Sequence, residues 1–241
     1  MTPQQHIDWV RDNVSWFESV PIDRLGVEVS NCPGWDVSDV FNHLTFGVGR
    51  SYPAALSKPP LTTANEVFVD VGRPAEYPIG AAVLSTFSTT MRRCIEAFES
   101  TDPETPCWTY AGPGTTKFWF RRAAIETALH RIDVEEALDG TQQPSLQNDR
   151  VLDALEETLE FAFPLAQQMT DKPEGRLTVL CPELGVEVDL GEGVPHGTIT
   201  GAGLDVLAAL WGRHRDRVTV SGDEDTARVW LLLIELAFAG R

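Results

Sequence analysis

The sequence predicts an α+β protein of two domains, a helical N-terminal domain followed by a small domain of mixed helices and strands. Up to residue 169, apolar residues recur mostly at helical spacing, whereas short alternating runs rich in β-branched residues appear only later. The 241 residues are enough to bury a sizeable core. We expect a helical domain over residues 1–145, a connecting helix over 146–170 and an α+β domain over 171–241.

Two helix starts are marked by capping residues. Thr2 can cap a first helix, with Pro3 at its first position and Gln5 placed to reach back to the cap. Asp36 can cap a second helix, whose apolar residues continue to Val48. Both starts therefore predict helices that belong to the N-terminal domain.

Two longer helices complete the predicted N-terminal domain, over residues 79–100 and 117–138, the second ended by Asp139-Gly140. Four antiparallel helices most naturally form a four-helix bundle. Residues 51–78 make a proline-rich connection that is longer than a compact bundle needs. We interpret this connection as a candidate binding loop.

After a fifth predicted helix over 148–169, the residue pattern changes from helical spacing to short alternating runs. The patterns then predict strands over 177–180, 185–190 and 197–200, a helix over 204–211, a strand over 217–221 and a closing helix over 223–239.

Charge and cysteine spacing exclude several classes of protein. The formal net charge of −17 argues against nucleic acid and anionic membranes as partners. The N-terminus shows no signal-peptide pattern, and the longest apolar run, 229–239, is broken by Glu235 and too short to span a bilayer. The four cysteines show no C-x-x-C spacing, so we expect reduced thiols and a cytoplasmic protein.

The stretch IETALHRID, residues 125–133, places Glu126, His130 and Asp133 within about 60° of one another on a helical wheel. Apolar residues flank this stripe on both sides, which points it into the bundle. Buried charge needs a partner, and a divalent metal is one partner for a carboxylate and an imidazole. An ordinary Glu–His helix pair is the alternative interpretation.

His43 on the second predicted helix makes the metal interpretation stronger. Antiparallel packing can place it opposite Glu126 and His130, and Gly47, one turn further on, leaves room beside it. Two imidazoles and one carboxylate leave a fourth position open, as in catalytic zinc sites. The remaining histidines are interpreted as structural or solvated: His6 in an exposed N-terminal turn, His196 in a Gly/Pro turn and His214 in a charged cluster.

Two more residues share the face of Glu126. Trp119 and Arg122 both lie within about 40° of it, so they are candidates to line the pocket and to bind a cofactor. The cysteines are not predicted to act as nucleophiles. Cys32, in the sequence Cys-Pro-Gly-Trp, is interpreted as part of a turn before a helix cap.

Three segments resemble a known family. CPGWDVSDVFNHL (32–44) and RRAAIETALHRIDVEEALDG (121–140) resemble the two signatures of the mycothiol-dependent maleylpyruvate isomerase family, and DVLAALWGR (205–213) is similar to a stretch of its C-terminal domain. This resemblance implies a DinB-like metal-binding four-helix bundle followed by a small, sterol-carrier-like α+β domain.

The resemblance also implies roles for single residues. His43, Glu126 and His130 would bind zinc or another divalent metal, and Asp133 would support them. Arg213 would reach from the C-terminal domain toward the substrate. The thiol cosubstrate would be mycothiol, the small thiol of actinobacteria. The expected partners are therefore a small thiol and a small electrophile, with the protein a monomer or a homodimer.

Zinc with one open position can bind a thiol as a thiolate nucleophile. Conjugate addition and release of that thiolate would give cis–trans isomerisation, whereas displacement at an electrophilic carbon would give an S-conjugate. In both reactions Arg213 would hold a carboxylate or an oxyanion. Two other classes stay open: a zinc hydrolase with Asp133 or another carboxylate as its base, and a non-catalytic binding protein that the metal stabilises.

Overall fold

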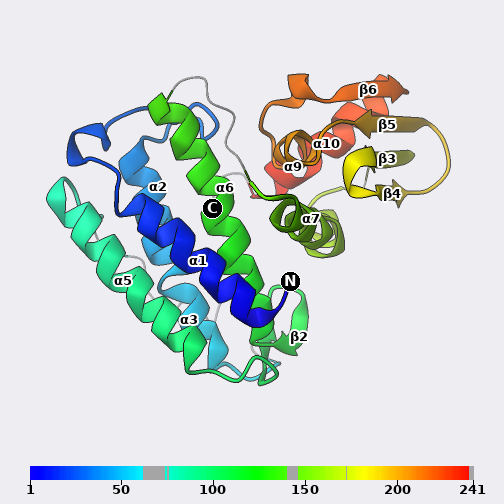
Figure 1. The fold of residues 1–241 in the computed structure, drawn as a ribbon. Helices are drawn as coiled ribbons and strands as arrows, with labels where there is room; N and C mark the ends of the chain where they lie inside the picture. The colour runs from blue at the N-terminus through cyan, green and yellow to red at the C-terminus, as the bar shows by residue number, and fades with distance from the viewer. Residues whose placement is uncertain (62–73, 75, 140–145, 172, 239–241) are drawn as a thin grey trace. The chain divides into compact units, whose positions relative to one another are not determined.

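The computed structural model of the chain describes residues 1–241 except 62–73, 75, 140–145, 172 and 239–241. The chain divides into two compact units, residues 1–144 and 145–241. The helical first unit and the α+β second unit (Figure 1) confirm the predicted fold class. The helix that we expected to connect two domains lies within the second unit.

The predicted helices of the first unit are all present. Its elements are α1 (Pro3–Phe17), the 3-10 turn η1 (Ile22–Arg24), α2 (Val37–His43), the π-helical turn η2 (Leu44–Val48), α3 (Ser51–Leu56), α5 (Ala81–Glu99) and α6 (Lys117–Asp139). Helices α1, α2, α5 and α6 pack against one another. Most of α6 is buried, including His130 and Asp133 of the stripe predicted to face the interior, whereas the Glu126 side chain is 19% exposed.

Capping sets where α1 and α2 begin, as the sequence predicts. The Thr2 hydroxyl accepts from the backbone N–H of Gln5, whose side chain accepts from the Thr2 N–H. Asp36 and Asp39 make the same reciprocal pair at the start of α2. Each box satisfies two backbone donors that a helix end leaves without a partner inside the helix.

An aromatic core holds α2 in place against its neighbours. Phe17, Phe41 and Phe87, from α1, α2 and α5, lie within 4.8–5.5 Å of one another between ring centroids, and all three are fully buried. One turn earlier on α1, the buried amide of Asn13 donates to Thr127 Oγ1 at 3.0 Å. These contacts fix the separation and rotation of the helices that carry His43 and Glu126.

Two elements of the first unit differ from the sequence prediction. Residues 51–56, expected to begin a binding loop, form helix α3; residues 62–73 and 75 of that loop lie outside the described residues. A two-stranded antiparallel hairpin, β1 (Pro106–Thr109) and β2 (Gly112–Thr115), precedes α6. Its Gly- and Pro-rich second strand lacks the β-branched alternation that identifies strands.

The second unit is a four-stranded sheet with helices. Its elements are α7 (Asn148–Glu157), the π-helical turn η3 (Thr158–Ala162), α8 (Phe163–Met169), β3 (Arg176–Cys181), η4 (Pro182–Leu184), β4 (Val186–Gly191), β5 (His196–Thr200), α9 (Gly203–Leu210), η5 (Arg215–Arg217), β6 (Thr219–Gly222) and α10 (Glu224–Phe238). The strand order is β4-β3-β5-β6; β3 and β5 are parallel and the other neighbours antiparallel. Helix α10 packs on β3 and β5.

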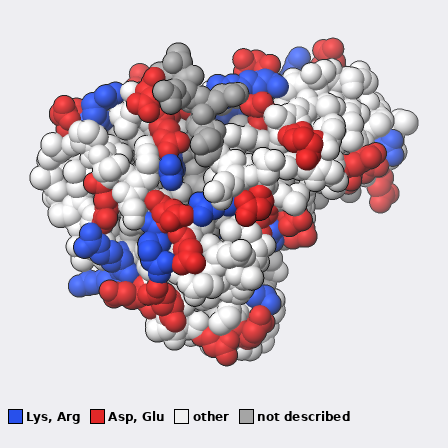
Figure 2. Space-filling model, viewed as in Figure 1, with Lys and Arg blue, Asp and Glu red and all other residues white. Residues whose placement is uncertain are grey.

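Acidic side chains are spread over the visible face of the molecule, with Lys and Arg among them (Figure 2), as the net charge of −17 requires. Among the helices of the described residues, none combines the length and the apolar character that crossing a membrane requires.

We predict that Gly49→Ala destabilises the first unit. A Cβ at this buried position would lie 2.8 Å from the Thr45 carbonyl oxygen and 2.9 Å from Met91 Sδ, so η2 and α5 would have to separate. The expected loss of unfolding free energy is about 1–3 kcal/mol, measured by urea denaturation.

Gly47→Ala is the matched control, because its Cβ would meet only the His43 ring, at an ordinary contact distance of 3.7 Å. Equal stabilities of the two variants would show that Gly49 does not limit the approach of these helices.

Candidate metal centre

The structure brings His43, Glu126 and His130 together inside the first unit. Their ligand atoms all lie within 4.8 Å of one another. His43 Nε2 lies 3.0 Å from Glu126 Oε1, and His130 Nε2 lies 3.6 Å from the same oxygen. One carboxylate oxygen thus faces two imidazole nitrogens, although His43 and Glu126 are 83 residues apart in the chain.

Local helix geometry aims these three side chains. Glu126 and His130 are four residues apart on α6, so they occupy the same face one turn apart. His43 is the last residue of α2, where the helix passes into the π-helical turn η2. Such turns are frequent at functional sites, since the extra residue re-aims the neighbouring side chains.

The second carboxylate oxygen of Glu126 pairs with Arg122. The Arg122 guanidinium donates to Oε2 from one turn earlier on α6, and its side chain is only 4% exposed. Burial by itself would raise the pKa of Glu126, but Arg122, His130 and His43 together hold that pKa well below its usual value. The carboxylate is therefore charged, with Oε2 occupied and Oε1 presented to the two histidines.

Asp133 holds the opposite side of the His130 ring. Its carboxylate Oδ2 lies 3.0 Å from His130 Nδ1, and the Asp133 side chain is fully buried. Burial by itself would lower the pKa of His130; hydrogen bonds with Asp133, Cys32 and Glu126 raise it well above its usual value. Asp133 thus fixes the orientation of the imidazole, which is a common supporting role beside metal ligands. Buried behind the ring, it is poorly placed to be the base of a hydrolase.

Aromatic rings enclose the cluster on two sides. The Trp35 ring stacks on His130 at 6.0 Å and meets His43 at 5.2 Å between centroids. On the other side, Tyr52 of α3 packs against Trp119 at 4.7 Å. Burial first, then the charge of Glu126, raises the pKa of Tyr52, whose side chain also contacts Arg122.

Of the two residues that we predicted to bind a cofactor, Arg122 contacts the cluster, whereas Trp119 packs against Tyr52. Trp119 is 1% exposed, and its indole N–H donates to the Trp108 carbonyl at 2.9 Å. Arg122 points at Glu126, as described above. Their binding of a cofactor stays a prediction.

Arg213 belongs to the second unit, just after α9. Its guanidinium donates to the Trp211 carbonyl at 2.8 Å, and its backbone N–H donates to Ala208 at the same distance. Its predicted contact with a substrate stays a prediction.

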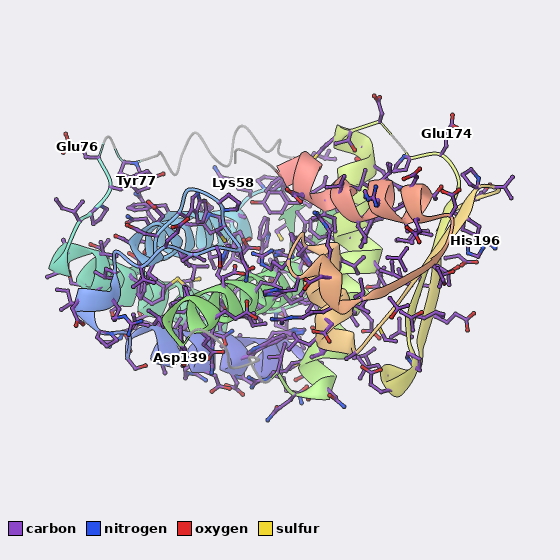
Figure 3. All side chains as sticks on the ribbon, turned by 90° about the horizontal axis from the view of Figure 1, so that it is seen from above. Lys58, Glu76, Tyr77, Asp139, Glu174 and His196 are labelled. Atoms are coloured by element: carbon purple, nitrogen blue, oxygen red, sulfur yellow. The ribbon has the colours of Figure 1, made fainter. Side chains whose placement is uncertain are left out.

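The remaining histidines differ partly from expectation. His6, expected in an exposed turn, is 5% exposed on the inner face of α1. His196 (Figure 3) begins β5 and forms hydrogen bonds with Thr178 at 2.8 Å and Arg176 at 3.3 Å, a network within the sheet of the second unit. His214 has a left-handed backbone, with φ of 46°.

Sequence reasoning missed Tyr52 and Cys32 as neighbours of the cluster. Tyr52 lies in the segment interpreted as a loop, and nothing in its spacing relates it to α6. Cys32 lies in the turn that the sequence predicts, yet its Sγ is 3.5 Å from Asp133 Oδ2. Arg122 was on the correct face, and its i, i+4 spacing from Glu126 was the signal for an ion pair.

These observations define the class of the molecule: a two-unit α+β protein with two histidines and a carboxylate gathered inside its helical unit. Residues 17–135 match the family described as "Mycothiol maleylpyruvate isomerase N-terminal domain". These residues therefore belong to the N-terminal domain family of the mycothiol maleylpyruvate isomerases, as the signature motifs indicated.

Solved structures support the fold over nearly the whole chain. The crystal structure of the mycothiol-dependent maleylpyruvate isomerase aligns with a TM-score of 0.64 and 17% sequence identity, covering 92% of this chain and 93% of that chain. A histidine-to-alanine mutant of the isomerase aligns over the same shares with a TM-score of 0.65 and 16% identity. Comparison with curated proteins gives no match.

We predict that Arg122→Met strongly destabilises the metal-free protein. The substitution roughly keeps the volume of the side chain but leaves the mostly buried carboxylate of Glu126 without its guanidinium partner. Breaking a buried ion pair in this way typically costs about 3–5 kcal/mol. Urea denaturation measures the change in the free energy of unfolding.

Arg92→Met is the matched control, since Arg92 pairs with Glu18 while its side chain is 67% exposed. An exposed pair contributes about 0–1 kcal/mol. Similar losses of unfolding free energy in both variants would show that the Arg122–Glu126 pair contributes no more to stability than an exposed pair.

Proposed function

We propose that this chain is a metal-dependent enzyme that uses a small thiol, such as mycothiol, as a metal-bound thiolate. The reaction would be either thiol-assisted cis–trans isomerisation or S-transfer to an electrophile, on a small substrate that can bear a carboxylate. The observation that carries the proposal is the convergence of His43, Glu126 and His130 within 4.8 Å. The family supports thiol chemistry, because its described members are mycothiol-dependent isomerases.

The residues fit a divalent metal such as zinc. Two imidazole nitrogens and one carboxylate oxygen are a zinc ligand set that leaves one position for an exogenous ligand. The distances of 3.0 and 3.6 Å between these atoms are near the separations of ligands around one ion. A metal held there would lower the pKa of a bound thiol and supply it as a nucleophile.

The surrounding residues prepare this site before any ligand arrives. Arg122 holds Oε2 of Glu126, so that Oε1 is the oxygen available to a metal. Asp133 can accept a hydrogen bond from the Nδ1–H of His130, which favours the tautomer with its lone pair on Nε2. Trp35 packs against both imidazoles, and the His43 side chain keeps 28% of its surface exposed. The site is therefore preorganised, with little reorganisation needed on binding.

In the isomerase reaction, the thiolate would form a carbon–sulfur bond with an activated double bond of the substrate. Rotation about the resulting single bond and loss of the same thiolate would return the double bond with changed geometry. No atom is gained or lost. In the S-transfer reaction, the leaving group would depart with its electron pair and the thiol would stay on the product. Arg213 is our candidate to hold a substrate carboxylate or oxyanion in either reaction.

We predict that the double substitution His43→Ala, His130→Ala abolishes stoichiometric zinc binding. It removes both imidazoles and leaves Glu126 as the single remaining ligand. Elemental analysis of the purified variant after dialysis measures the metal content. His214→Ala is the control and should keep the zinc of the original chain. Full zinc occupancy in the double variant would rule out the site.

We further predict that mycothiol binds the zinc-loaded protein and not the metal-free protein. Calorimetric titration of both forms measures the difference, and the double variant is the control. Absence of binding to the zinc-loaded form would contradict the thiol-dependent function while leaving the metal site intact.

A further inference from the structure

His130 takes part in a second set of possible metal ligands, on the other side of its ring. Cys32, His130 and Asp133 also have their ligand atoms within 4.8 Å of one another. Asp133 Oδ2 lies 3.0 Å from His130 Nδ1 and 3.5 Å from Cys32 Sγ. Thiolate, imidazole and carboxylate are the three ligand types that zinc uses in proteins.

The spacing of these three atoms suits a single ion. Zinc bonds of about 2.0–2.3 Å in a tetrahedral arrangement place neighbouring ligand atoms roughly 3.3–3.7 Å apart. The observed separations of 3.0 and 3.5 Å are close to that range, so a small outward movement would admit an ion. Cys32 is only partly buried, which leaves a path from solvent to this side of the ring.

The chemistry of imidazole makes the two sets alternatives. A neutral histidine carries one lone pair, on Nδ1 or on Nε2. When His130 Nε2 is the ligand, Nδ1 carries the proton and donates to Asp133. When Nδ1 is the ligand, the proton moves to Nε2, where Glu126 Oε1 lies 3.6 Å away as an acceptor. Each tautomer therefore has a carboxylate on its protonated side, at hydrogen-bond distance from Nδ1 and 3.6 Å from Nε2.

We propose that Cys32, His130 Nδ1 and Asp133 form a second, thiolate-containing site for zinc or another thiophilic divalent cation such as cadmium, as an alternative to the His43, Glu126 and His130 site. Binding replaces the thiol proton of Cys32, which leaves to solvent. A thiolate ligand favours softer cations, so the two positions differ in the metals they prefer. One ion occupies one position or the other.

The test uses cadmium alone as the probe, in the His43→Ala variant. This variant lacks one ligand of the first set and keeps all three of the second. We expect thiolate-to-cadmium charge-transfer absorption in the ultraviolet that saturates at one equivalent. The absorption should be lost completely in His43→Ala, Cys32→Ser and retained in His43→Ala, Cys181→Ser, because Cys181 is a buried residue of β3 in the second unit and is not one of the three proposed ligands.

Two outcomes would overturn the proposal: no charge-transfer absorption in the His43→Ala variant, or absorption that persists after Cys32→Ser is added. Circular dichroism establishes that each variant is folded, and His43→Gln repeats the measurement if the alanine variant unfolds. The Cys32→Ser single variant separates this proposal from the proposed function. It should bind zinc through His43, Glu126 and His130 alone. Loss of zinc from this variant would contradict the proposed function, whereas loss of cadmium absorption from the His43→Ala variant would contradict the second site.

Discussion

One carboxylate, that of Glu126, has to stay charged inside the helical unit, and much of the arrangement around it follows from that constraint. Burial opposes the charged form, and three cations or hydrogen-bond donors offset it. Arg122 comes from the same helix and needs only the geometry of α6. His43 comes from α2, so the packing of α2 and η2 against α5 and α6 determines whether His43 contacts Glu126.

The polar contacts extend outward from Glu126 in a defined order. His130 lies between two carboxylates, with Glu126 near Nε2 and Asp133 near Nδ1, and Cys32 lies beside both His130 and Asp133. Because each member restricts the next, the cluster is rigid without needing many residues. Apolar rings close its sides, which keeps the local dielectric low and strengthens every charge interaction within it.

The parts of this arrangement that depend on local sequence could be predicted. Capping at Thr2 and Asp36 is decided within four residues, and both boxes are present. The inward direction of Glu126, His130 and Asp133 follows from helical periodicity alone. The contact between His43 and Glu126 depends on how two helices pack, so it is less local. Two antiparallel helices can pack in only a few registers, and the residues at the edge of each apolar face reduce that number further.

The parts that could not be predicted depend on contacts between segments that carry no signal for one another. Cys32 and Asp133 are 101 residues apart in the chain. The sequence predicts a turn at Cys32, but it carries no signal for which residue the thiol contacts. Tyr52 reaches the cluster only because residues 51–56 form a helix within a proline-rich stretch, where packing against α5 and α6 overrides weak local propensity. Sequence periodicity thus identifies which faces turn inward, whereas the identity of the facing atoms is decided by tertiary packing. In this protein that packing sets a thiol and a tyrosine beside a cluster whose histidines and carboxylates alone were visible in the sequence.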